Sequence, residues 1–219
     1  MIVDSPLYFM VFIGYGSALT ITLTVCSFCM GFCLAVIFSI MVYNKVALLP
    51  IRTFVSIVRG TPLLLQISFL YFVVPNVFGV KFSALTAGII SFGLNSSAYL
   101  TQIFRGGIDG IPSGQFEAAH TLRVSKFHTW KDIILPQVIS NIWLTIINEL
   151  IALLKETPII SIIGGMDLMR RSQMIAAQQF NYFTPLCIAG AYYYFFVSLI
   201  TLLGELAKNR LFRWNIKQN

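Results

Sequence analysis

The sequence predicts an all-α integral membrane protein that crosses the bilayer five times and forms one domain over residues 1–219. Hydrophobic residues make up 57% of the chain and charged residues only 11%, with a mean hydropathy of +0.81. Soluble domains carry about 25% charged residues. At about 20 residues per span, the uncharged stretches leave room for five or six spans. Four cysteines in a chain of this length are too few for a disulfide scaffold.

The spans are predicted from stretches that carry almost no charge. These stretches are 7–44, 60–80, 82–104, 133–154 and 172–204. The first is longer than one span and has room for an interfacial lead-in. It contains no Lys or Arg before its apolar core, so it does not fit a signal peptide, and we expect it to be retained. In the last stretch, Pro185 predicts that the membrane helix begins nearby.

The distribution of basic residues predicts the orientation. Eleven Lys and Arg fall in the segments after the first, third and fifth spans, against four on the opposite side. The positive-inside rule then places the N-terminus outside and the C-terminus in the cytoplasm. The net charge of +7 also fits basic cytoplasmic loops better than nucleic-acid binding.

The predicted cytoplasmic segment 105–137 is rich in turns. It reads RGGIDGIPSGQFEAAHTLRVSKFHTWK and then DIILPQ. Ser113 is a candidate N-cap for a short helix that opens at Glu117-Ala118-Ala119. Phe116, Leu122 and Phe127 would be exposed to water in this segment, which favours a docking element. A loop that merely folds on its own membrane ends is the alternative.

Three motifs resemble one family. The run EAAHTLRVSKFHTWKDIILPQ at 117–137 resembles the EAA loop of ABC importer permeases, and RGTPLLLQ at 59–66 and KETPI at 155–159 resemble the polar amino acid branch. The resemblance implies a type I ABC importer permease fold in a bacterial cytoplasmic (inner) membrane. It also implies a second permease subunit, as homodimer or heterodimer, a cytoplasmic ABC ATPase dimer and an extracytoplasmic amino-acid-binding protein. The residues it assigns to ATPase coupling are Glu117, Ala118, Ala119 and Arg123.

Three positions depart from the family pattern. Arg123 stands where the EAA motif has Gly, and a non-Gly residue with positive φ costs roughly 1 kcal/mol. Gln102 replaces a common Glu, and Pro158 follows Thr157 where the family has Ser.

The chain is predicted to be a transport subunit and not an enzyme. It has no Gly-Lys dipeptide, hence no phosphate-binding P-loop, so ATP hydrolysis is expected from the separate ATPase. His120 and His128 lack a cluster at ligand spacing, so no metal and no cofactor are predicted. Cys26, Cys29 and Cys33 are expected to form a packing stripe of small residues.

Glu149, Arg59 and Thr61 are the candidate substrate-binding residues. Glu149 lies 13 residues after Pro136, or about 20 Å along a helix, where an acid is costly unless it is paired or hydrated. A structural ion pair with a buried cation is the alternative role. Arg59 precedes a backbone break at Gly60 and Pro62 and can bind a carboxylate.

The predicted function is import of polar amino acids by alternating access. Asn148-Glu149 resembles the pair common in permeases for basic amino acids, which implies arginine, lysine or histidine as substrate. Glutamine or another polar amino acid is the alternative. A membrane-embedded enzyme lacks a visible nucleophile and base at helical spacing. A scaffold that binds an ATPase without moving solute is a further alternative, which solute flux would exclude.

Overall fold

The computed structural model describes residues 5–211, and every regular element in that range is helical. The elements in chain order are α1 (Pro6–Gly14), α2 (Gly16–Tyr43), α3 (Leu48–Gly60), α4 (Leu63–Ser68), a π-helix (Phe69–Val73), α5 (Val74–Phe78), α6 (Ala84–Asp109), α7 (Ser113–Thr121), α8 (Lys126–His128), a second π-helix (Thr129–Ile134), α9 (Leu135–Glu156), a 3₁₀-helix (Thr157–Ile163), α10 (Leu168–Gln179) and α11 (Phe183–Leu211).

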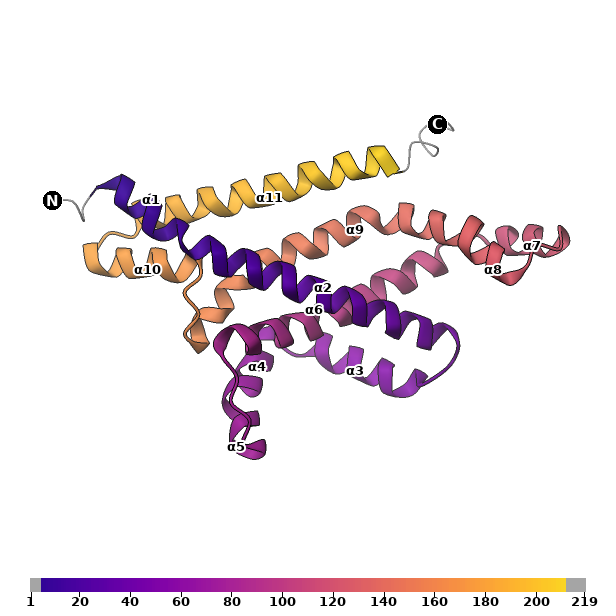
Figure 1. The fold of residues 1–219 in the computed structure, drawn as a ribbon, viewed down its shortest axis with the longest axis horizontal. Helices are drawn as coiled ribbons and strands as arrows, with labels where there is room; N and C mark the ends of the chain where they lie inside the picture. Colours follow the sequence, from indigo (N-terminus) through magenta and orange to yellow (C-terminus); the bar gives the residue numbers. More distant parts are fainter. Residues whose placement is uncertain (1–4, 212–219) are drawn as a thin grey trace.

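The long helices α2, α6, α9 and α11 run along the long axis of the molecule (Figure 1). The short helices α7 and α8 lie at one end, and α1 and α10 lie at the other. The α4–α5 segment projects sideways from this bundle. The ends of the molecule are therefore built by different parts of the chain, with the predicted coupling segment far from α10.

Three helical stretches are long and apolar enough to cross a membrane: Pro6–Tyr43, Lys126–Ile163 and Phe183–Arg210. A fourth is obtained if α3 and the Leu63–Phe78 stretch are counted as one broken span. The helix α6 has 26 residues but is less apolar, because buried polar side chains interrupt it. The count of five spans and the orientation of the termini therefore stay predictions, whereas the all-helical character is confirmed.

Two predicted spans are divided in the structure. The stretch 60–80 is broken at Pro62, and α3 and the Leu63–Phe78 stretch meet at an angle of 104°. The stretch 172–204 contains the end of α10 and then α11, which begins at Phe183, close to the predicted start at Pro185. The sequence predicted the break at Gly60 and Pro62 and the start of a helix near Pro185, but it did not predict the separate helix α10.

Small residues contribute to the most extensive helix contact, between α2 and α6. A Cβ added to Gly31 would lie 2.9 Å from Ser96 Cβ, so a larger side chain would force the two helices apart. The predicted packing stripe of cysteines is exposed within the described chain. Cys29 and Cys33 line an apolar cavity beside α6 and α9. A different set of α2 residues is buried in the bundle. Those buried residues are Thr20, Leu23, Thr24, Ser27, Gly31 and Ala35.

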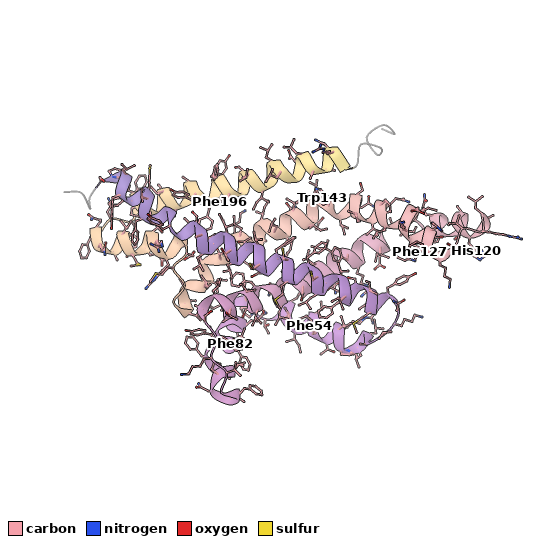
Figure 2. The ribbon with its side chains drawn as sticks, in the orientation of Figure 1. Phe54, Phe82, His120, Phe127, Trp143 and Phe196 are labelled. Atoms are coloured by element: carbon pink, nitrogen blue, oxygen red, sulfur yellow. The ribbon has the colours of Figure 1, made fainter. Side chains whose placement is uncertain are left out.

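Side-chain hydrogen bonds and rings join the other helices. Trp143 Nε1 donates a hydrogen bond to the backbone oxygen of Gly204 at 2.8 Å, which ties α9 to α11. Figure 2 shows Trp143 on the side of α9 that faces α11. Phe54 packs edge to face on Phe38, with ring centroids 5.5 Å apart, and this contact holds α3 against α2. These contacts hold in place α2, α3 and α9, which also pack against α6.

Candidate functional site

One turn of α6 meets residues from α3 and α9. Ser96 Oγ donates a hydrogen bond to Glu149 Oε1 on α9 at 3.0 Å. The guanidinium carbon of Arg59, at the end of α3, lies 5.1 Å from the centroid of the Tyr99 ring. Ser96 and Tyr99 are three residues apart, so they are neighbours on the helix surface, about 4.5 Å apart along its axis. The predicted cation and the predicted carboxylate therefore contact adjacent positions of the same helix.

Glu149 retains hydrogen-bonding capacity. Its side chain is half-buried, and Ser96 is its hydrogen-bond partner. Within residues 5–211, no Lys or Arg forms an ion pair with it, so the alternative of a structural ion pair is not realised there. An ionised carboxylate has about four lone-pair sites. The geometry leaves this group able to accept hydrogen bonds from a cationic ligand.

Arg59 is exposed at the end of α3. It lines a cavity of about 430 Å³ with Arg52, Ser56 and Gln102. Its guanidinium stacks against Tyr99, which orients the charge without neutralising it. The donors of this side chain are therefore open to an anionic group in the cavity.

Thr61, the third predicted binding residue, is engaged within the chain. Its hydroxyl donates to the backbone oxygen of Ile57 at 2.9 Å and accepts from Gln66 Nε2 at 3.0 Å. Gln66 Nε2 also lies 2.8 Å from the oxygen of Val58, and Gln66 Oε1 accepts from Asn95 Nδ2 at 3.3 Å. The broken end of α3 is thus tied to α6. These bonds indicate that Thr61 helps to hold the break in shape.

Sequence reasoning missed the α6 residues of this site. The contacts are made by Asn95 to Gln66, by Ser96 to Glu149 and by Tyr99 to Arg59. None of these α6 residues was predicted from the sequence. A signal was present, because Asn95-Ser96-Ser97 interrupts an otherwise apolar span. Buried polar side chains in such a span need partners.

A second polar cluster lies at the end of the molecule that carries α10. Asp167 caps α10, accepting hydrogen bonds from the backbone N–H of Arg170 at 2.9 Å and of Met169 at 3.2 Å. Tyr193 Oη donates to Asp167 Oδ2 at 3.1 Å. Burial raises the pKa of the Asp167 carboxyl, and the hydrogen bonds from Arg170, Met169 and Tyr193 oppose that shift. This cluster joins α10 to α11 and was not predicted.

The coupling segment folds as a short helix with a tight exit. The helix α7 begins at Ser113 with Pro112 as its N-cap, so the prediction of Ser113 as the cap was wrong by one residue. Pro112 holds the extended backbone that an N-cap needs, with φ −58° and ψ 137°. After α7, Arg123 has φ +56°, which is the conformation that the family's Gly would favour. Its backbone N–H donates to the oxygen of His120 at 3.0 Å.

The predicted coupling residues divide into an inner and an outer set. Ala119 is 2% exposed, whereas Glu117, Ala118 and Arg123 are exposed. The outer face also carries apolar side chains, with Leu122 76% and Phe127 67% exposed. Figure 2 shows His120 and Phe127 at the tip of the molecule.

Phe116 was predicted to be exposed with these residues, but it turns inward. Its ring centroid lies 6.1 Å from that of Trp130, and the Trp130 centroid lies 4.7 Å from that of Tyr43 at the end of α2.

The histidine His128 of this segment pairs with an acid, because its Nδ1 lies 2.8 Å from Asp132 Oδ2. Over residues 5–211 no group of His, Cys, Asp and Glu has the arrangement of a metal site.

The chain is similar to known transport proteins over most of its length. The family model of the binding-protein-dependent transport system inner membrane component matches residues 28–214. A putative glutamine transport system permease protein of Rickettsia typhi is 43% identical over 202 residues, covering 91% of this chain and 93% of the relative. The arginine transport system permease protein of Bacillus subtilis is 38% identical over 207 residues, covering 91% and 92%.

Solved structures agree on the fold. A crystal structure of an amino acid ABC transporter with histidines matches with a TM-score of 0.83 and 32% identity, covering 93% of this chain and 96% of that chain. An inward-facing methionine ABC transporter matches with a TM-score of 0.75 at 16% identity, which supports the fold alone. The chain therefore belongs to the binding-protein-dependent transport system inner membrane component family, as a multi-pass inner-membrane permease subunit of amino acid ABC transporters and not an enzyme.

Proposed function

We propose that this permease subunit moves basic amino acids, arginine first, and that Glu149 receives their cationic side chain. The supporting observation is a half-buried carboxylate on α9 that has Ser96 as its hydrogen-bond partner and no paired cation within residues 5–211. A carboxylate in apolar surroundings is costly unless a cation or water meets it. A passing guanidinium satisfies that requirement through two parallel hydrogen bonds.

Arg59 complements Glu149 in this proposal. It is exposed on a cavity beside α6, and its guanidinium is positioned by the Tyr99 ring. A substrate carboxylate can bind this guanidinium bidentately while the opposite end of the amino acid meets Glu149. Thr61 acts indirectly, by holding the α3 break through its bonds to Ile57 and Gln66.

Uptake of matched substrates tests the role of Glu149. The complete transporter, reconstituted in vesicles with its ATPase and binding protein, is supplied with labelled arginine or with citrulline, its neutral isostere. We expect Glu149→Gln to lower kcat/KM for arginine about 30-fold, corresponding to about 2 kcal/mol for a charged hydrogen bond, and to leave citrulline nearly unchanged. Glu205→Gln, an exposed acid on α11, is the matched control.

Glutamine is the second candidate substrate. It is favoured by the 43% identity to a putative glutamine permease, which exceeds the 38% identity to the arginine permease. If Glu149 binds the α-ammonium that all amino acids share, uptake of arginine and glutamine falls equally in Glu149→Gln. That result would contradict the side-chain role and support glutamine.

We further propose that the segment 105–137 docks on a cytoplasmic ABC ATPase dimer and that two permease subunits share the pathway with an extracytoplasmic binding protein. The exposed Leu122 and Phe127 on the outer face support a protein partner there. Glu117, Ala118 and Arg123 lie exposed in the same segment.

Ala118 offers a sharper test of docking than Ala119. Because Ala119 is buried, a larger side chain there strains the fold by about 1–3 kcal/mol. Ala118→Leu leaves the fold intact and places bulk on the docking face. We expect ATP hydrolysis to continue while uptake falls at least tenfold. Normal uptake in Ala118→Leu, with normal assembly, would refute the docking proposal.

A further inference from the structure

A basic cavity lies where α2 turns into α3, beside the end of α6. It has a volume of about 250 Å³ and is lined by Lys45, Arg52, Arg105, Tyr43, Thr101 and Gln102, among others. A water molecule occupies about 30 Å³ in the liquid, so the cavity has room for about eight. It is large enough for a phosphate group with its glycerol. The end of α6 leads directly into α7, so the cavity lies at the end of the molecule that carries the coupling segment (Figure 1).

The charges around this cavity favour an anion. Three cations and one carboxylate, Asp109, line it, which leaves a net charge of +2. Arg105 Nε lies 3.4 Å from Asp109 Oδ2, so these two charges offset each other. Lys45 and Arg52 form no ion pair within residues 5–211. Two unpaired cations that share a partly enclosed cavity attract a phosphate or carboxylate.

Part of the cavity lining is apolar, because Val42, Tyr43, Leu48 and Ile51 contribute to it. Tyr43 is 53% exposed. A free phosphate or an amino acid gains little from such a lining, whereas the acyl chains of a lipid gain by covering it. Basic pockets between membrane helices on the cytoplasmic side are a known chemical match for anionic lipid headgroups.

We propose that this cavity binds the phosphate of an anionic phospholipid through Lys45 and Arg52, with the acyl chains over Val42, Tyr43 and Leu48. Lys45 reaches the cavity from a turn in which it has φ +58° and Ala47 has φ +49°.

The position of the cavity connects the lipid to coupling. Tyr43 lines the cavity and packs against Trp130, which packs against Phe116 of α7. Occupation of the cavity fixes Tyr43 and through it the base of the coupling helix. We therefore expect bound anionic lipid to raise substrate-stimulated ATP hydrolysis by the assembled transporter. Arg52 and Gln102 also line the cavity beside Arg59, so the two cavities adjoin. The lipid proposal does not depend on which amino acid is carried.

Lipid retention measures the site directly. The assembled transporter is extracted from vesicles of phosphatidylethanolamine and phosphatidylglycerol, and retained lipid is counted by native mass spectrometry. Each basic residue near an anionic surface contributes roughly fivefold, so we expect the double variant Lys45→Gln with Arg52→Gln to hold phosphatidylglycerol about 30-fold more weakly. The control, Lys81→Gln with Arg170→Gln, also removes one exposed Lys and one exposed Arg, both predicted on the opposite side of the membrane, and should stay within about twofold of the wild type.

Competition experiments distinguish binding of a lipid from binding of a soluble anion. Inorganic phosphate, glycerol 1-phosphate and excess arginine, each added at millimolar concentration, should leave the retained phosphatidylglycerol in place. Equal retention by the double variant and the wild type would overturn the site. Displacement of the lipid by glycerol 1-phosphate or inorganic phosphate would assign the cavity to a soluble anion and overturn the lipid. Displacement by arginine would make it part of the substrate path.

Discussion

Glu149 and Asp167 are both acidic residues packed among apolar helices, but their surroundings use the carboxylate differently. Asp167 is fully buried and accepts hydrogen bonds from two backbone N–H groups and from the Tyr193 hydroxyl. Glu149 is half-buried and has one partner, Ser96. The first carboxylate is occupied by the fold and the second is available to a ligand.

The difference separates structural acids from functional ones in a membrane bundle. A buried polar group that is fully hydrogen-bonded stabilises one arrangement of its helices. A group with unused lone pairs in apolar surroundings is costly until something binds it. Apolar context alone therefore does not identify a binding residue, and the role proposed for Glu149 depends on its unused lone pairs.

The two carboxylates should differ most clearly in the stability that the protein loses when each is removed. Asp167→Ala removes the N-cap of α10 and the shorter of the two hydrogen bonds of the Tyr193 hydroxyl, which keeps Thr157 Oγ1 at 3.4 Å, and these losses together cost about 2–3 kcal/mol. Glu149→Ala leaves the Ser96 hydroxyl without its partner, at a cost of about 1 kcal/mol, but it also removes a carboxylate that is costly in apolar surroundings, so the net loss should not exceed about 1 kcal/mol. The midpoint of thermal unfolding of the assembled transporter in detergent measures both. A larger loss for Glu149→Ala than for Asp167→Ala would reverse the assignment.

Ser96→Ala tests whether the one partner of Glu149 matters for function. The hydroxyl holds Glu149 Oε1 at 3.0 Å, so its loss should let the side chain move and lower kcat/KM for arginine about fivefold, or about 1 kcal/mol. Ser91→Ala is the matched control, because Ser91 is a buried serine of α6 whose hydroxyl has no partner within residues 5–211. Equal effects of the two changes on uptake would indicate that α6 packing, and not Glu149, is affected.

Much of the fold could be predicted, because apolar stretches must be helical in a bilayer. The stretches 7–44 and 133–154 correspond to helical candidate spans in the structure. The family resemblance also identified Arg123 as the position of positive φ. The count of five spans could not be secured, because α6 hides a polar face and α3 turns sharply into α4.

The candidate site was predicted only at its charged members. Arg59 and Glu149 were visible as charges within or beside apolar stretches. Ser96 lies 53 positions from its partner Glu149, and no local pattern joins them. The Asp167 cluster was missed for the same reason, since Tyr193 reaches it from 26 positions away. Pairings of this kind are set by helix packing, which spacing along one chain does not encode.

The smallest expected effect is a dependence of stability on pH that arises from the titration of Asp167. Burial raises its pKa in the folded protein above the usual 3.8, so the folded state holds the proton more tightly than the unfolded state does. The stability that protonation contributes is complete below the unfolded pKa and is lost as the pH rises through the raised folded pKa. Asp167→Asn cannot titrate. The unfolding midpoint of the wild type should therefore fall relative to that of Asp167→Asn as the pH rises above about 4, by less than the equivalent of about 1.4 kcal/mol per pH unit. The contrary result is an unfolding midpoint of the wild type that rises relative to that of Asp167→Asn as the pH rises. It would mean that the Tyr193 and backbone donors stabilise the charged carboxylate more than burial disfavours it. Asp167 would then resemble an ordinary exposed helix cap.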